Sequence, residues 1–185
     1  MNNGTKVVYR IDSQDRIVFV NDVWQHFASE NDAPDYAAEG VLNRSLWDFI
    51  TDSTTRQFYQ EVIKAARGEK PVTFNFRCDS AEYRRFMKMR VTGETGLVQF
   101  ETETLAVEQR PPQPLLDRHS RRSGELVVIC GWCKKINIGQ AIWKEVEHAI
   151  EALRVFEQEK IPQLSHGMCH GCYVMVSEQL KNLCG

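Results

Sequence analysis

Apolar and polar positions alternate over five stretches of the first 105 residues, the period of a β-strand with one covered face. Two of them, 7–11 and 17–20, are rich in β-branched and aromatic residues and flank a polar turn, which predicts a hairpin. The other three, 72–78, 83–91 and 97–105, come later, with a glycine-containing turn between the last two. The pattern therefore predicts a group of two strands and a group of three.

Helical patterns fill the segment between the two groups of strands. Asn21 or Asp22 can cap a first helix, and 45–50 has the composition of a short helical turn. Residues 53–67 place apolar side chains on one stripe and are followed by a glycine, as expected at the end of an amphipathic helix. Helices packed on one face of a five-stranded antiparallel sheet would form an α+β fold.

The composition changes once, between Glu108 and Gly124, where three prolines precede a polar stretch that contains three arginines. Prolines remove backbone donors, and a polar stretch gains little from burial, so this range predicts a linker. The chain is therefore predicted to contain an amino-terminal domain at 1–107, a linker at 108–124 and a small carboxy-terminal domain at 125–185.

Composition limits the classes of function. The chain of 185 residues is 42% hydrophobic and carries a net charge of -2, which suits a globular protein and gives no sign of a polyanion-binding surface. Met1–Lys6 is polar and has no apolar core, so no signal peptide is expected and a cytoplasmic location is predicted. The sequence contains no nucleophile elbow, phosphate-binding glycine loop or HExxH pair, and we therefore expect no catalysis.

Two segments of the amino-terminal domain resemble the PAS family of sensory domains. They are Tyr9-Arg-Ile-Asp-x-x-x-Arg-Ile-x-x-Val-Asn21 and Gly40-x-x-x-x-Ser45-Leu-Trp-Asp-Phe49, and the three later strands extend the likeness over about Val7 to Leu105. The resemblance implies a concave sheet that covers a pocket beneath the helices. The residues expected either to line this pocket or simply to fill a core are Trp24, Phe27, Trp47, Phe49, Phe58, Phe74, Phe76, Met87, Met89 and Phe100.

Family cofactors can be tested against single residues. Flavin-binding members of the light-sensing type carry a reactive cysteine near the middle helices, where this chain reads Val41-Leu-Asn-Arg-Ser45. Haem-binding members use a histidine on the long helix, whereas 53–67 contains none and His26 lies on the first helix. Haem and flavin stay open alternatives that the residues disfavour.

Two Cys-x-x-Cys pairs, Cys130 with Cys133 and Cys169 with Cys172, lie in the carboxy-terminal domain. Two intervening residues let both sulfurs of a pair face one ion, and four thiolates fill the tetrahedral shell of a structural zinc site. Such a closed shell leaves no position for a reacting water. The small domain would gain part of its folding free energy from the metal.

Other residues bear on the ligand set. His166 or His170 could replace a cysteine in a Cys₃His shell, whereas two complete pairs favour Cys₄, with His166 as a residue that orients the ligand loop. Cys78 is expected to pack as a small hydrophobe, and Cys184 to be an exposed thiol near the end of the chain.

Two helices are predicted around the cysteine pairs. Apolar residues recur at helical spacing from Ile142 to Phe156, which predicts one helix that covers the metal site. Apolar positions between Tyr173 and Leu183 predict a closing helix after the second pair.

The pairs belong to a longer pattern, Ile129-Cys-x-x-Cys-Lys-Lys-Ile136 and then Ser165-His-Gly-Met-Cys-x-x-Cys172. It resembles a cysteine module appended to PAS and receiver domains in bacterial signalling proteins, whose usual form is Ser-His-Gly-Ile-Cys-Pro-x-Cys. Met168 and His170 depart from that form. The resemblance implies a signalling protein that acts in trans through protein contacts, and PAS-like domains often form homodimers through their sheets.

Two other functions are open at this point. Lys134 and Lys135 beside Cys133 would favour the thiolate form, so oxidation could release zinc and unfold the module, as in a redox sensor. Nucleic-acid binding is disfavoured, because seven glutamates outnumber six lysines and arginines over 125–185.

Overall fold

Contacts within the chain divide it into two compact units. The computed structural model describes residues 6–30, 36–117, 119–157 and 159–184. The first unit comprises Met1–Asn75, Met87–Leu105 and Glu178–Gly185, and the second comprises Phe76–Phe86 and Ala106–Ser177. No helix among the described residues is long and apolar enough to cross a membrane.

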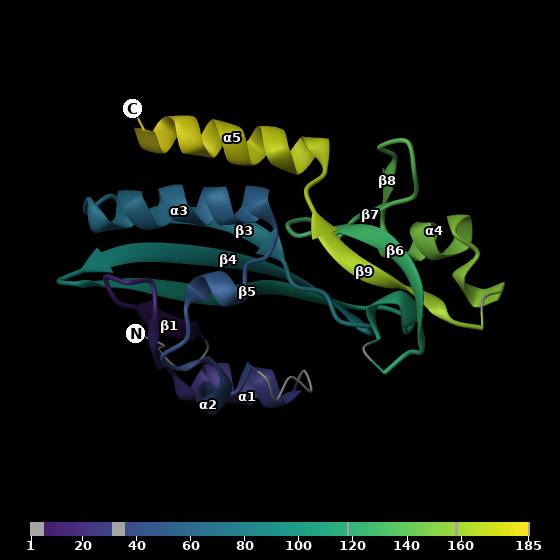
Figure 1. The fold of residues 1–185 in the computed structure, drawn as a ribbon, viewed down its shortest axis with the longest axis horizontal. Coiled ribbons are helices and arrows are strands. Elements are labelled where there is room, and N and C mark those ends of the chain that lie inside the picture. The colour runs from purple at the N-terminus through teal and green to yellow at the C-terminus, as the bar shows by residue number, and fades with distance from the viewer. Residues whose placement is uncertain (1–5, 31–35, 118, 158, 185) are drawn as a thin grey trace. The chain divides into compact units, whose positions relative to one another are not determined.

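A five-stranded antiparallel sheet organises the first unit (Figure 1). The strands run in the order β2-β1-β5-β4-β3, so β1 lies between β2 and β5, a strand from the second group. Tyr9 is the partner of Val20 on one side and of Phe100 on the other, which fixes the register. The strands are β1 (Val7–Ile11), β2 (Ile17–Val20), β3 (Val72–Arg77), β4 (Tyr83–Glu94) and β5 (Leu97–Gln109).

Side-chain caps start the two longer helices of this unit. The Asn21 carboxamide oxygen accepts a hydrogen bond of 3.0 Å from the Trp24 amide, and the Asp52 carboxylate accepts one of 2.7 Å from the Thr55 amide. The predicted helix over 53–67 is confirmed residue for residue. The helical elements are α1 (Asp22–Glu30), α2 (Ala38–Val41), the 3₁₀ turn η2 (Leu46–Asp48) and α3 (Ser53–Arg67).

Aromatic side chains join the helices to one face of the sheet. Tyr9 and Phe100 stack across β1 and β5 with ring centroids 4.4 Å apart. Trp24 of α1 meets the edge of Tyr9 at 5.4 Å, and Tyr59 of α3 stacks on Phe100 at 6.3 Å. Because both helices contact the same pair of rings, they cover the same face. The predicted α+β fold with helices on one face is therefore confirmed.

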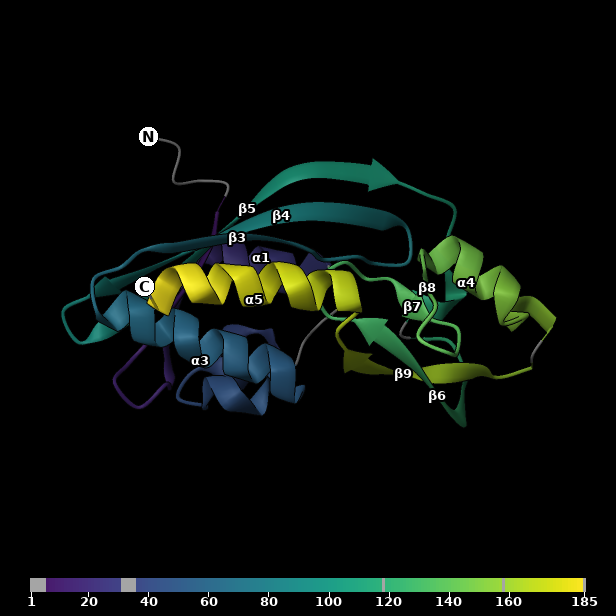
Figure 2. The same cartoon turned by 90° about the horizontal axis from the view of Figure 1, so that it is seen from above.

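The second unit contains a four-stranded mixed sheet that the sequence analysis did not predict (Figures 1 and 2). Its order is β8-β7-β6-β9, and β9 runs parallel to β6. A buried apolar cluster that includes Leu115, Ile129 and Ile150 forms the core. The elements are β6 (Arg122–Cys130), β7 (Ile136–Asn137), β8 (Trp143–Lys144), α4 (Val146–Ala152), the 3₁₀ turns η3 (Pro114–Leu116) and η4 (Val155–Glu157), and β9 (Ile161–Gly167).

Two predicted segments differ from the structure. The helix expected from Ile142 to Phe156 is shorter: Ile142 and Phe156 are 49% and 73% exposed, and the regular helix is α4 alone. The range 108–124, predicted as a linker, holds the end of β5, η3 and the start of β6. Leu115 within it is fully buried, because its side chain belongs to the core of the second unit.

The closing helix is confirmed as α5 (His170–Cys184). β3, β4 and β5 begin at the predicted residues but end at Arg77, Glu94 and Gln109, away from the predicted ends. Each of the three strands contains residues of both units. The division by contacts therefore differs from the predicted division at 107 and 125.

Replacing Phe58 by alanine should destabilise the first unit. Phe58 is fully buried, with its ring against Phe74 at 5.1 Å, and its removal leaves a cavity that costs about 3–5 kcal/mol. Urea unfolding followed by circular dichroism measures the change. Lys64→Ala on the same helix is the control, because the Lys64 side chain is 79% exposed and should change stability by less than about 0.5 kcal/mol. A Phe58→Ala loss no larger than that of the control would contradict the packing described.

Candidate metal centre

The first cysteine pair lies in a tight turn between β6 and β7. Cys130 is the last residue of β6, and its amide donates to the Lys135 carbonyl at 2.8 Å. The Lys134 amide donates back to the Cys130 carbonyl at 3.0 Å, and Lys134 has the positive φ of 61° that closes the turn. This turn holds Cys133 close to Cys130.

The second pair lies at the start of α5. Cys169 immediately precedes the helix, and its carbonyl accepts from the Tyr173 amide at 2.9 Å, the bond of a first helical turn. Cys172 is in that turn. The amino terminus of a helix carries partial positive charge, which stabilises thiolates.

Parallel pairing of β6 with β9 brings the two pairs together. Cys130 is the partner of Gly167 in the ladder, and the Gly131 amide donates to the Gly167 carbonyl at 2.9 Å. Two residues beyond Gly167 the chain reaches Cys169. Cysteine pairs 36 residues apart or more in sequence therefore meet at one end of the sheet.

The four sulfurs form one cluster, with every pair of Sγ atoms within 4.8 Å. Cys133 Sγ and Cys169 Sγ are 3.6 Å apart. A tetrahedral zinc–thiolate site with bonds of about 2.3 Å places its sulfurs roughly 3.8 Å apart. The four cysteines are therefore arranged as a set that can hold a metal ion.

Backbone amides also point at the sulfurs. The Cys169 amide lies 3.4 Å from Cys130 Sγ, and the Cys172 amide lies 3.5 Å from Cys169 Sγ. Amide donors stabilise the ionised form of a thiol, which is the form that binds metal.

The pKa values of the clustered thiols also indicate that the site needs a cation. Hydrogen bonds from the Cys133 and Cys172 thiols lower the pKa of Cys130, because they stabilise its thiolate. The same contact with Cys130 raises the pKa of Cys133 to about 12, and contact with Cys130 also raises the pKa of Cys172. Several thiolates this close repel one another, so a divalent cation is what would let all four ionise.

Histidines are not part of this cluster. Among the described residues, the group of ligand atoms contains Cys130, Cys133, Cys169 and Cys172 alone. His166 and His170 are both exposed. Cys78 is half-buried, and burial raises the pKa of its thiol. The side chain of Cys184 lies outside the described part of the chain.

The predicted pocket residues of the first unit lie in several places. A cavity of about 170 Å³ includes Trp24 and Phe49 of the predicted set among its lining, together with Tyr9, Tyr36, Val41, Leu46, Ile50 and Tyr59. Phe58, Phe74, Met87, Met89 and Phe100 are buried, and Phe27, Trp47 and Phe76 are half-buried. Tyr9 and Tyr59 line the cavity but were not among the predicted lining residues, because which side chains of a strand and a helix meet at one cavity depends on the tertiary packing.

The Tyr59 hydroxyl lies 3.8 Å from Met89 Sδ, and burial raises the pKa of both Tyr9 and Tyr59. Both phenols therefore stay protonated and bring no charge to the wall of this cavity. The histidine of the first unit named above, His26, is exposed.

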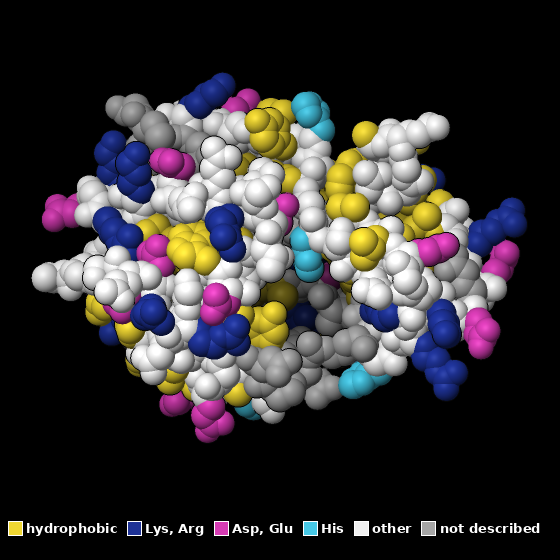
Figure 3. All heavy atoms as spheres, viewed as in Figure 1, with side chains coloured by type: hydrophobic (Ala, Val, Ile, Leu, Met, Phe, Trp, Pro, Cys, Tyr) yellow, Lys and Arg dark blue, Asp and Glu magenta, His cyan; other side chains and the backbone are white. Residues whose placement is uncertain are grey.

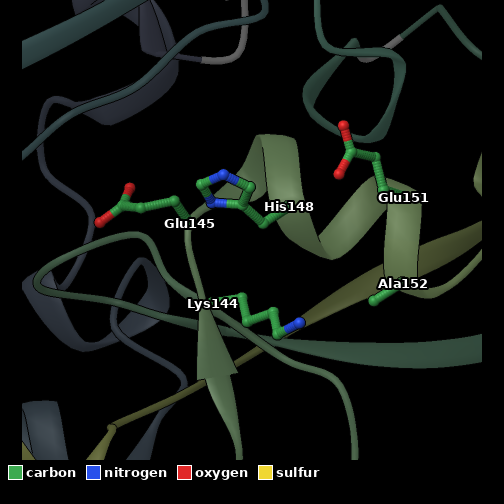
Figure 4. Close-up of a pocket in the computed structure, with 5 residues that line it drawn as sticks. All are labelled: Lys144, Glu145, His148, Glu151 and Ala152. Atoms are coloured by element: carbon green, nitrogen blue, oxygen red, sulfur yellow. The ribbon is translucent and has the colours of Figure 1, made fainter.

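An open depression of about 610 Å³ lies beside α4 in the second unit (Figure 4). Figure 4 shows Glu145 and His148 at one side of it and Glu151 at another, with Lys144 below. Lys144, His148 and Glu151 are exposed, so water solvates their polar groups and we assign the depression no ligand.

Comparisons with known proteins give structural likeness only. No protein-family model and no curated protein matches the chain, whereas 13 chains of solved structures do. A sensory box sensor histidine kinase from Vibrio cholerae is 10% identical and covers 55% of this chain and 83% of its own, with a TM-score of 0.40. A PAS domain from a two-component sensor histidine kinase is 18% identical and covers 59% and 88%, with a TM-score of 0.34. The fold class therefore rests on the strand order and helix packing described above.

Replacing Gly167 by alanine should disturb the contact between β6 and β9 that brings the two cysteine pairs together. A Cβ at Gly167 would lie 2.8 Å from Val128 Cγ1, and the stiff valine cannot move away freely. Overpacking of this kind costs about 1–3 kcal/mol. Thermal unfolding measures it, and Val128→Ala in the same chain should recover part of the loss.

The matched control is Gly124→Ala on the same strand β6, because a Cβ there meets nothing within 4 Å. Equal effects of Gly167→Ala and Gly124→Ala, or no recovery in the double variant, would be inconsistent with this close packing.

Proposed function

We propose that this chain is a non-catalytic signalling protein, in which a PAS-like sensing domain is joined to a structural zinc module that contacts other proteins in trans. The observation that carries the proposal is the convergence of four thiols within 4.8 Å. A shell of four thiolates leaves no open coordination position, which supports a structural role over a catalytic one.

Zinc is the ion that this ligand set favours. Four soft sulfur ligands in tetrahedral arrangement suit zinc or an iron–sulfur centre, and oxygen-preferring cations do not compete for thiolates. The two Cys-x-x-Cys pairs in a small unit are typical of zinc modules. The small apolar core of the second unit supports the further proposal that metal binding supplies part of its folding free energy.

The sensing role is proposed for the first unit. The sequence resemblance to PAS domains supports it, as does a five-stranded sheet whose aromatic face is covered by α1 and α3. The cavity of about 170 Å³ is comparable to apolar protein cavities of about 150 Å³ that hold benzene. A small, uncharged, largely apolar molecule is the ligand that such walls would accept.

The partners that we propose are signalling proteins and a second copy of this chain, in the cytoplasm. Val18 and Phe19 of the edge strand β2, each 39% exposed, support association of two copies through the sheet. Sedimentation equilibrium of the purified protein should give twice the chain mass of 21.4 kDa. A mass that stays at the monomer value up to high concentration would remove the homodimer from the proposal.

Burial favours the structural role over the thiol-based redox sensor. Cys130, Cys169 and Cys172 are buried and Cys133 is half-buried, which limits the access of an oxidant to the sulfurs. Nucleic-acid binding has little support. Basic and acidic side chains are interspersed on the face drawn in Figure 3, whereas phosphate binding needs a continuous basic surface.

Metal analysis of the purified protein tests the central proposal. We expect one zinc per chain and a colourless solution, because zinc has a filled d shell. Cys169→Ser should lose the zinc and part of the helical signal in circular dichroism. Cys78→Ser is the control and should keep one zinc, since Cys78 is not in the cluster. Wild-type protein that carries no zinc, or a visible absorption band of iron, haem or flavin, would overturn the proposal.

A further inference from the structure

The turn that joins β3 to β4 contacts the first cysteine pair within the second unit. The Arg77 amide, at the end of β3, donates to the Trp132 carbonyl at 2.8 Å. Trp132 lies between Cys130 and Cys133 and is 4% exposed. A residue far outside the predicted metal module of 125–185 therefore fixes the backbone between its first two ligands.

Ion pairs also hold the side chain of Arg77 in place. Its guanidinium donates to Glu145 at 2.8 Å and to Asp79 at 2.5 Å, and only 10% of the side chain is exposed. Burial by itself would lower the pKa of Arg77, whereas the hydrogen bonds to Asp79 and Glu145 raise it, so the group stays charged. Glu145 immediately precedes α4, so its ion pair with Arg77 joins the 76–86 turn to the start of that helix.

Further charges extend this contact into a network. The carboxylate of Asp79, which is 1% exposed, also forms an ion pair with Arg110 at 3.3 Å. Arg110 and Arg84 both donate to one carboxylate oxygen of Glu147, at 2.9 and 3.1 Å. Guanidinium and carboxylate groups alternate, so each buried charge has an opposite partner. We call the set Arg77, Asp79, Arg84, Arg110, Glu145 and Glu147 the arginine network.

Backbone bonds hold the same turn against the segment after β5. The Arg110 amide donates to the Glu82 carbonyl at 2.9 Å, and the Gln113 amide donates to the Ala81 carbonyl at 3.0 Å. Leu115, two residues on, is in the core of the unit. Residues 76–86 therefore pack as part of the same unit as the four cysteines.

We propose that the arginine network positions the metal centre: the β3–β4 turn at 76–86 holds the first cysteine pair in its metal-binding geometry through Arg77. The inference rests on the proposed zinc site and names the residues that set its affinity. Groups that orient metal ligands change metal affinity by roughly 10–100-fold when removed. The coupling is reciprocal, so zinc in turn holds the 76–86 turn in place.

Zinc affinity of full-length variants tests the inference, by competition with a chromophoric chelator. Arg77→Ala should weaken zinc binding roughly tenfold or more, and Arg77→Lys, which keeps the charge, should lie between this variant and the wild type. The cobalt-substituted Arg77→Ala protein should also have altered thiolate–metal absorption bands, because the ligand geometry changes.

Two control variants separate positioning from general loss of stability. Arg44→Ala breaks an exposed pair with Asp48 in the first unit and should leave zinc affinity within about twofold. Ile150→Val shortens a buried side chain of the second unit outside the network, and its cobalt spectrum should match the wild type. A zinc affinity of Arg77→Ala that equals that of Arg44→Ala would overturn the inference.

Hydrogen exchange of the wild-type protein gives an answer even where Arg77→Ala does not fold. Removal of zinc with a chelator should speed exchange of the amides in 76–86, whereas amides of α3 should keep their protection. Unchanged protection of 76–86 without zinc would overturn the inference. Wild-type protein that never binds zinc is a different result, because it overturns the proposed function itself.

Discussion

The parallel pairing of β6 with β9 is the constraint on which the metal centre depends. The two strands are separated by thirty residues, and their ladder places Cys130 beside Gly167. The end of β6 leads into one cysteine pair and the end of β9 into the other. Without this ladder the sulfurs would be two independent pairs, and neither pair by itself completes a metal shell.

Buried charge is the second feature that this unit needs. Asp79 is almost fully buried and has two arginine partners, while Arg77 also reaches Glu145 at the start of α4. Each of these groups would be costly to bury alone, because a charge without a partner loses its hydration. The segments that carry them, the β3–β4 turn, the end of β5 and α4, therefore need one another to fold.

Different kinds of interaction stabilise the two units. The first has a continuous aromatic core, in which Tyr9, Phe100, Tyr59 and Trp24 join the sheet to its helices. The second has a smaller aliphatic core and adds ionic contacts and a thiol cluster. This difference fits the proposed division of roles, in which the first unit senses and the second is a structural zinc module.

The sequence by itself determined the parts that follow from local pattern. Alternation and helical spacing gave all five strands of the first sheet and α3, since these depend on which side chains lie on one face. The spacing of Cys130, Cys133, Cys169 and Cys172 gave the candidate ligand set, because two residues between sulfurs suit one ion. Only the tertiary structure decided where β6 and β9 pair and where α4 begins. It also decided that Arg77, Asp79 and Arg110 belong with the cysteines, because partners far apart in sequence leave no periodic trace in the chain.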